Sequence, residues 1–468
     1  HAHFYSYGYL QNTLNLHGSP SLDAAVASIA AYAEAKSSAP WIIGRGWNQV
    51  LWPSNAFPSA RDIDAVVSDR PVWLSRIDGH AGWANSAALE LAGIGDDTSD
   101  PVGGKIVRDE NGRATGVLID LAMDLVEAHV PRPGKDDIRA AMRAANDALL
   151  SEGITSVHDA GVDLARAEVL LAMADDGELD LRIYAMISGA GDTLDASGKP
   201  IVGYGNDHVD IASVKLDSDG ALGSRGAAMI EPYSDDPENR GLPFWTQKEL
   251  DDMVAKANGR GFQVGVHAIG DLGNRMVLDA FETVQGGKPS PLRNRIEHSQ
   301  IVTLEDIPRF AELGIVASMQ ATHATSDMNM AEDRVGPERI LGAYAWRRML
   351  DAGVVLANGS DFPVELSNPF HGLYASVTRQ DRGGEPEGGW YADQALTRGE
   401  TLHSFTLAAA WAAHQENRLG SLEPGKWADF IIIDRDYFTV PADEIDDIVV
   451  LETWVGGKKV FERKEGAE

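Results

Sequence analysis

Short apolar, β-branched runs alternate with helix-forming segments along most of this chain of 468 residues. Such runs occur at residues 154–159, 181–187, 211–216, 263–267, 294–298, 315–320 and 354–358. A further strand is expected just before or at residues 1–3. Eight strands that alternate with helices predict the α/β class and, within it, a (β/α)₈ barrel of the TIM type.

The helix signals between these runs support the alternation. Thr246 and Glu249 form a capping-box pattern ahead of a helix over 250–257. Helices are also expected over 21–36 and 136–150, and over 303–310 with a stop at Gly314, because glycine is favoured just after a helix.

Two regions depart from the barrel pattern. Residues from about 38 to 120 contain five tryptophans with many Gly and Pro, which predicts a long insertion after the first barrel strand. Residues 421–468 hold an apolar run at 429–434 and a hairpin pattern at 449–461 around Gly456 and Gly457. We expect a catalytic barrel domain over 1–420, insertion included, followed by part of a small β-sandwich. The other part of that sandwich is expected upstream of His1.

Composition narrows the possible partners. A net charge of −31 argues against nucleic acid and anionic membranes, which favour a basic protein face. No apolar stretch of about 20 residues is present, so no membrane-spanning helix is expected. The chain has no cysteine, so any metal must bind nitrogen and oxygen ligands. We expect a small-molecule substrate and allow for a homodimer, and the cellular compartment is left open.

Residues suited to binding metal lie at the ends of the predicted strands. His1 and His3 are two residues apart, so on a strand both rings point the same way. The other four candidates end or follow later strands: Lys215, His267, His298 and Asp361. The carboxyl ends of barrel strands meet at one mouth, so these six side chains are predicted to converge. The alternatives are a fortuitous histidine pair, core histidines bonded to backbone, and a buried Lys215 paired with Asp217 or Asp219.

Several longer motifs make the chain similar to the amidohydrolase superfamily, and within it to the branch of the N-substituted formamide deformylases. They are H-x-H at 1–3, RIDGHAGWANS at 76–86, VKLDSDGALGSR at 214–225, VHAIGD at 266–271, RIEHSQ at 295–300, GSDFP at 359–363 and GSLEPGKWADF at 420–430. The resemblance covers essentially the whole chain. It specifies a superfamily and leaves the substrate open.

This resemblance implies two divalent metal ions, commonly zinc, bridged by a hydroxide and by a carboxylated Lys215. His1, His3 and Asp361 would hold the first ion, and His267 and His298 the second. Asp361 would also act as general base and acid while the hydroxide hydrolyses an amide-type C–N bond. The alternatives are an ester or lactone hydrolase with the same site, or a catalytically silent binding barrel.

Further residues are candidates for contact with the substrate. The resemblance suggests that His80 reaches the substrate or its oxyanion, and a structural role in a turn is the alternative. His323 follows the seventh strand and is a second candidate, and His158 is a candidate ligand or a partner of one. Three weaker candidates for substrate binding are Trp83, Asn85 and Arg225. The tryptophans could instead pack the insertion, and Arg225 could pair with Glu231 or Asp235.

Overall fold

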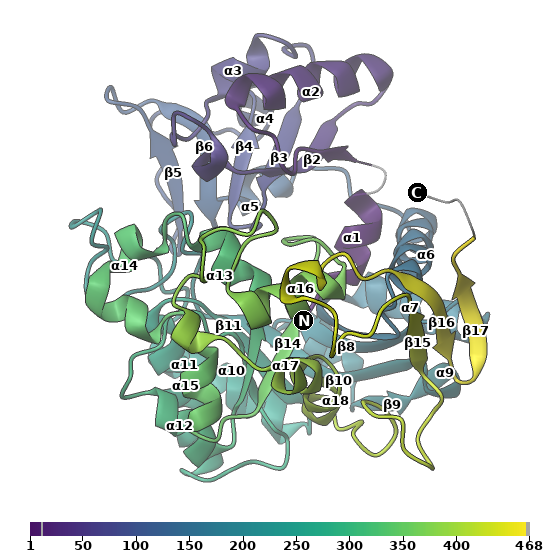
Figure 1. Cartoon of the computed structure of the whole chain (residues 1–468). Helices are drawn as coiled ribbons and strands as arrows, with labels where there is room; N and C mark the ends of the chain where they lie inside the picture. Colours follow the sequence, from purple (N-terminus) through teal and green to yellow (C-terminus); the bar gives the residue numbers. More distant parts are fainter. Residues whose placement is uncertain (11–12, 465–468) are drawn as a thin grey trace.

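The computed structural model describes residues 1–10 and 13–464 and shows a mixed α/β protein with three sheets (Figure 1). The main sheet is curled and runs in the order β14-β13-β12-β11-β10-β8-β7, with every neighbouring pair parallel. Its strands are β7 Ser156–Val162, β8 Arg182–Ser188, β10 Val209–Asp217, β11 Gln263–Ala268, β12 Arg295–His298, β13 Val316–Gln320 and β14 Leu356–Gly359, with the short β9 Ile201–Gly203 antiparallel to β10. Each overlaps a run predicted from the sequence except β9, which was not expected.

The first three residues hydrogen-bond to the outer strand β7 and to the segment that follows the other outer strand, β14. On one side the Ala2 N–H donates to the His158 carbonyl at 2.9 Å, and the Ala160 N–H donates to the Ala2 carbonyl at 2.8 Å. On the other side the His3 N–H donates to the Phe362 carbonyl at 2.8 Å, just beyond β14. Residues 1–3 therefore lie between β7 and β14, where the sequence placed the first barrel strand.

The helices outside the insertion connect the strands, and most of them cover the outside of the curled sheet (Figure 1). They are α1 Phe4–Leu10, α6 Lys135–Ser151, α7 Leu164–Asp175, α8 Asp192–Ser197, α9 Tyr204–Asp207, α10 Gln247–Gly259, α11 Asp271–Gln285, α12 Ile307–Leu313, α13 Ala321–Asp327, α14 Ala331–Arg339, α15 Trp346–Asp351, α16 Pro369–Thr378, α17 Arg398–Phe405 and α18 Leu407–Ala412. Short 3₁₀ turns lie at η2 Ile340–Gly342, η3 Ala392–Gln394 and η4 Ala442–Glu444.

The predicted helix starts were right for α10 and wrong for α12. Thr246 and Glu249 form the expected capping box in front of α10. Helix α12 begins at Ile307 and not at Thr303, because a start at Thr303 would place Pro308 in the helix interior, where it breaks the hydrogen-bond ladder. Thr303 instead accepts a hydrogen bond from the Asp306 N–H at 3.2 Å in the preceding turn.

The insertion is wider and more regular than the sequence predicted. It contains a six-stranded sheet in the order β1-β2-β3-β4-β6-β5 that begins at residue 14 and not near 38. Its strands are β1 Leu14–Asn15, β2 Ile42–Trp47, β3 Val72–Arg76, β4 Ala81–Ala84, β5 Gly104–Arg108 and β6 Ala114–Asp120, with α2 Leu22–Ala35, η1 Gln49–Leu51, α3 Ala60–Asp64, α4 Ser86–Leu91 and, just after β6, α5 Asp124–Glu127. Helix α2 is the crossover between the parallel strands β1 and β2, which draws residues 14–37 into this unit.

Tryptophans form much of the core of the insertion. Trp47 and Trp83 are fully buried, and their ring centroids lie 6.1 Å apart. Trp52 joins them at 6.3 Å from the ring of Trp47. Their packing role, one of the two readings of the sequence, is therefore the one that the structure shows.

The C-terminal strands form a third, antiparallel sheet of β15 Phe430–Ile433, β16 Val450–Val455 and β17 Lys458–Glu462. The predicted hairpin turns at Gly456 and Gly457, where both glycines have a positive φ. Thr453 ties the sheet to the barrel by donating a hydrogen bond to the Leu150 carbonyl at 2.6 Å. Among the described residues, no helix has the length and apolar character needed to cross a membrane.

Candidate metal centre

The six predicted ligand residues meet at the carboxyl ends of the main-sheet strands. His1 and His3 come from the first segment, Lys215 from β10, His267 from β11, His298 from β12, and Asp361 from the segment after β14. All six line one cavity of about 740 Å³. The cavity lies between the carboxyl ends of the main-sheet strands and the insertion, which contributes residues from β2, β3 and the loop after β3.

Two sets of side chains in this cavity place three ligand atoms within 4.8 Å of one another. One set is His1, His3 and Asp361, and the other is His298, His323 and Asp361. Asp361 Oδ1 lies 3.2 Å from the Nε2 atoms of both His1 and His3. His1 Nε2 and Asp361 Oδ1 are buried and make no hydrogen bond. Buried polar atoms without a partner are costly, so this donor set fits a divalent cation with nitrogen and oxygen ligands.

Hydrogen bonds to the outer ring nitrogens fix the orientation of three histidines. The Nδ1 atoms of His1, His3 and His298 lie 2.6, 2.8 and 2.7 Å from Glu297 Oε2, the Ala160 carbonyl and Gln320 Oε1. These partners accept a proton, so in the neutral imidazole each Nε2 keeps the lone pair that a metal requires. His267 is turned the other way: its Nε2 faces the Gly220 carbonyl at 3.4 Å, so Nδ1 is its candidate ligand atom.

Electrostatics favour neutral imidazoles at two of the candidate ligands. Burial lowers the pKa of His298 to about 3, and burial with the neighbouring His298 lowers that of His267 well below its usual range. Burial also acts to lower the pKa of His1, but the carboxylates of Asp361 and Glu297 outweigh it and raise the value to about 9. Neutral imidazole is the metal-binding form, so His267 and His298 are ready to bind at neutral pH.

Lys215 is buried at the cavity wall, and its Nζ donates to Asp217 Oδ1 at 2.5 Å. This is the pairing that the sequence left open as the alternative to a modified lysine. Asp219 has a different function, because it accepts hydrogen bonds from the backbone N–H groups of Ala228, Ile269 and Gly270. It thereby fixes the loop that follows His267.

Glu297 is a site residue that the sequence analysis missed. It is fully buried, accepts from His1 Nδ1, and pairs with Arg295, whose Nε lies 2.8 Å from Glu297 Oε1. Arg295 also donates to His158 Nδ1 at 2.8 Å, which makes His158 a more remote support and not a ligand. A sequence signal existed: Arg295 and Glu297 stand two residues apart in a predicted strand, so their side chains of opposite charge share one face.

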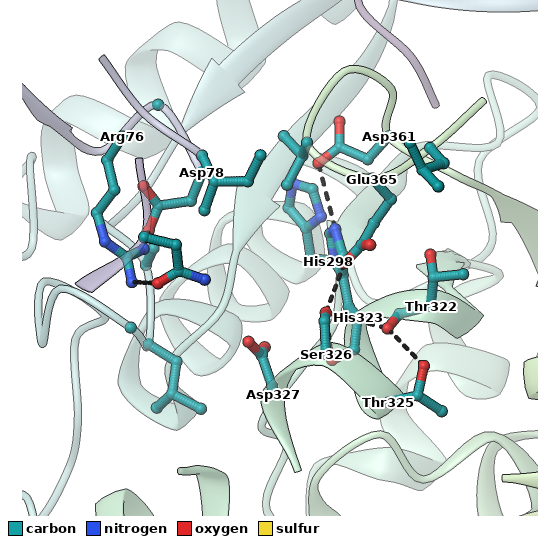
Figure 2. A pocket seen from close by; sticks show the side chains of 18 of the residues that line it. Arg76, Asp78, His298, Thr322, His323, Thr325, Ser326, Asp327, Asp361 and Glu365 are labelled. Atoms are coloured by element: carbon teal, nitrogen blue, oxygen red, sulfur yellow. Dashed lines mark hydrogen bonds and ion pairs between the residues drawn. The ribbon is translucent and has the colours of Figure 1, made fainter. Parts of the chain in front are cut away.

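His80 and His323, the two predicted catalytic histidines, both line the cavity. His80 Nδ1 lies 2.8 Å from Asp120 Oδ1, and its ring centroid is 4.8 Å from that of His267. Burial would lower the pKa of His80, but Asp120 and then Asp78 raise it to about 9. His323, on α13, places Nε2 3.7 Å from Asp361 Oδ2 (Figure 2). Asp120, at the end of β6, had no signal in the sequence, because its partner is 40 residues away.

The three predicted substrate contacts lie away from the cavity lining. The Trp83 ring is in the insertion core, where Nε1 donates to the Ser59 carbonyl at 2.8 Å. Asn85 is fully buried and caps α4 by accepting from the Ala88 N–H at 3.0 Å. Arg225 pairs with Asp235 at 3.0 Å, as the alternative reading stated. All three have structural partners, and none is among the described residues that line the cavity.

Comparisons with known proteins agree with this geometry. A family model described as "Amidohydrolase family" matches residues 1–461. Protein LONG AFTER FAR-RED 3 of Arabidopsis thaliana is 34% identical over 98% of this chain and 81% of that protein. The putative amidohydrolase YtcJ of Bacillus subtilis is 30% identical over 99% of this chain and 88% of that protein, and the N-substituted formamide deformylase of Arthrobacter pascens is 28% identical over 90% and 79%.

Among solved structures, a metal-dependent hydrolase of Pyrococcus horikoshii superposes with a TM-score of 0.75 at 28% identity, over 94% of this chain and 86% of that one. The family match spans nearly the whole chain, and the ligand-type residues meet in one cavity. The chain therefore belongs to the amidohydrolase family and is a metal-dependent hydrolase.

Proposed function

We propose that this enzyme hydrolyses an amide-type C–N bond in a small molecule, with two divalent metal ions, zinc by preference, at the mouth of a (β/α)₈ barrel. The observation that carries the proposal is the convergence of His1, His3, His267 and His298 with the unpartnered Asp361 Oδ1 in one cavity. The similarity to a deformylase of N-substituted formamides supports an N-acyl substrate.

The donor set divides into two groups. His1, His3 and Asp361 would hold one ion, and His267 and His298 the other, and a carboxylated Lys215 would supply oxygen ligands. When bound, such ions lower the pKa of a coordinated water and polarise a carbonyl. Carboxylation would replace the Lys215 ammonium by an oxygen ligand and would end its bond to Asp217.

Two groups of the chain move or hold protons in this scheme. The Asp361 carboxylate takes a proton from the attacking water and passes it to the nitrogen of the leaving amine, because an amine leaves readily only when protonated. His80, held by Asp120, donates a hydrogen bond toward the oxygen that becomes negative during the attack. His323 lies beside Asp361 Oδ2 and orients that carboxylate.

Metal content measured by plasma mass spectrometry on protein purified without chelator tests the metal centre. We expect about two ions per chain and a sharp fall in Lys215→Ala, whereas Lys248→Ala, which alters an exposed lysine paired with Asp252, keeps the full content. One ion per chain that is unchanged in Lys215→Ala would refute the bridging lysine. Protein that takes up no metal under any loading condition would refute the hydrolase mechanism.

The leaving group distinguishes the amide from the ester reaction. Asp361→Asn should lower turnover of N-formyl and N-acetyl amines more than turnover of an activated ester, whose alkoxide needs less help from a proton donor. The comparison is made between preparations of equal metal content. An equal loss in both reactions would contradict the role of Asp361 as the proton donor.

A further inference from the structure

Arg45 brings a positive charge into the cavity from the insertion. It lies near the end of β2, which is parallel to β3, so the ends of both strands reach the cavity with Arg45 and Arg76. Neither residue belongs to the metal ligand set. They line the wall that the insertion, and not the barrel, provides.

Four lysine and arginine residues line the cavity, and they differ in whether they have a carboxylate partner. Arg76 binds Asp78 and also donates to Gln49 Oε1 at 2.8 Å. Lys215 is bonded to Asp217, and Arg382 lies 3.9 Å from Asp446. Arg45 is the exception: in residues 1–10 and 13–464 no carboxylate lies within 4.0 Å of it.

The remaining contacts of Arg45 do not satisfy its guanidinium. Within the described part of the chain, the guanidinium makes one hydrogen bond, from a terminal nitrogen to the Ile77 carbonyl at 2.7 Å. Its Nε is buried and has no partner. Burial lowers its pKa, and the charges of Asp361 and Asp78 oppose that change. An arginine keeps its charge in proteins, and this half-buried guanidinium has no carboxylate partner, so an anion that arrives with the substrate would give it one.

The opposite wall of the cavity carries charge of the other sign. Asp327 ends α13, and Glu365 follows β14; both face the cavity together with His298 and Asp361 (Figure 2). Asp327 accepts hydrogen bonds from Tyr344 and Gln300 at 2.7 Å, and Glu365 accepts one from Ser326 at 2.5 Å. An anionic group would be repelled by the carboxylates of Asp327 and Glu365 and attracted by the guanidinium of Arg45.

We propose that Arg45 binds a carboxylate of the substrate, at the end of the molecule remote from the scissile bond. The inference rests on the proposed function, since it places the scissile amide at the metal centre. The substrate class is then the N-acylated amino acids, or other N-acyl amines that carry a carboxylate. The planar guanidinium presents parallel N–H donors that match the two oxygens of such a group.

Matched substrates test this proposal. Formate release is measured from the N-formyl derivatives of β-alanine, γ-aminobutyrate and ε-aminocaproate, each beside its neutral primary carboxamide. The wild type should prefer the carboxylate of at least one pair. Arg45→Gln should lower kcat/KM for that carboxylate about 10- to 100-fold and change the rate for the carboxamide by less than about twofold.

Two further variants separate binding from folding. Arg45→Lys keeps the charge but loses the two parallel N–H donors of the guanidinium, so it should keep part of the preference for the carboxylate substrate. Arg113→Gln removes an exposed arginine of the same insertion that pairs with Asp109, and should match the wild type. If Arg45→Gln reduced the carboxylate and carboxamide rates by the same factor, Arg45 would be a structural residue and the proposal would be overturned.

A failure of the proposed function would be recognised separately. If the wild type released neither formate nor, from N-acetyl analogues, acetate, the amidase reaction would be wrong, and Arg45 would be tested by binding alone. Calorimetric titration of the zinc-loaded protein with glutarate should then show binding at least about tenfold weaker in Arg45→Gln than in the wild type. Equal binding by the two proteins would overturn the assignment of Arg45.

Discussion

Replacing Glu297 by glutamine should weaken both the fold and the metal site. The Glu297 carboxylate binds two partners at full burial: Arg295, through contacts of 2.8 and 3.0 Å, and His1 Nδ1, at 2.6 Å. Glutamine keeps the shape of the side chain and removes its charge. Arg295, which is fully buried, would lose its counter-ion, and His1 would lose the acceptor that orients its ring.

The two effects have different magnitudes. Breaking a buried ion pair by removing one partner costs about 3–5 kcal/mol, because the other charge stays in the interior. Loss of a hydrogen-bond partner behind a metal-binding histidine lowers metal affinity about 10- to 100-fold. The first effect is measured by urea unfolding of the metal-free protein, and the second by competition for zinc with a chromophoric chelator. Glu312→Gln, at an exposed position on α12, is the matched control.

A double variant separates the two losses. Arg295→Met with Glu297→Gln removes the unpaired charge, so much of the lost stability should return while the zinc affinity stays low. Wild-type zinc affinity in Glu297→Gln would refute the orienting role that we assign to Glu297. A loss of stability below about 1 kcal/mol would refute the buried ion pair as a strong constraint.

Three further outcomes are expected. Trp47→Ala should cost about 3–5 kcal/mol in urea unfolding, because a fully buried indole in the insertion core is removed; a loss near zero would contradict that packing. Arg347 and the cap at Thr397 lower the pKa of Glu400 to about 2, so its stabilisation is present above its ordinary pKa of 4.5 and is lost as the pH falls through about 2. The stability difference between wild type and Glu400→Gln, at most about 1 kcal/mol for this partly exposed pair, should therefore shrink between pH values of about 6 and about 2, and a constant difference would exclude the ion pair. Removal of metal by a chelator should lower the unfolding temperature, and added zinc should restore it by mass action; an unchanged temperature would argue against a resident ion.

The barrel strands were predictable because their signals are local. The runs at 263–267 and 294–298 are short and end at a histidine, and β11 and β12 fall there. The start of α12 shows where prediction from local sequence signals fails. Thr303 is a good capping residue, but Pro308 decides where the helix can begin, and the two signals compete within six residues.

The insertion was less predictable because its order comes from packing. Its strands are short, several contain glycine, and their hydrophobic faces are completed by partners far along the chain. Strand β1 has two residues and exists through its pairing with β2, about 30 residues later. The same reason explains Trp83 and Asn85: both resemble binding residues in a Gly-rich motif, yet both are held inside the insertion.

The sequence alone determined the family, the curled parallel sheet and the identity of the ligand-type residues, since strand ends of a parallel sheet meet at one edge whatever the loops do. Only the tertiary structure determines which other side chains lie against these residues or line the same cavity. Glu297 behind His1, Asp120 behind His80 and Arg45 on the insertion wall are joined by contacts between residues that lie far apart in the chain. A single sequence does not show which distant residues form such contacts, because they depend on how two sheets pack around one cavity.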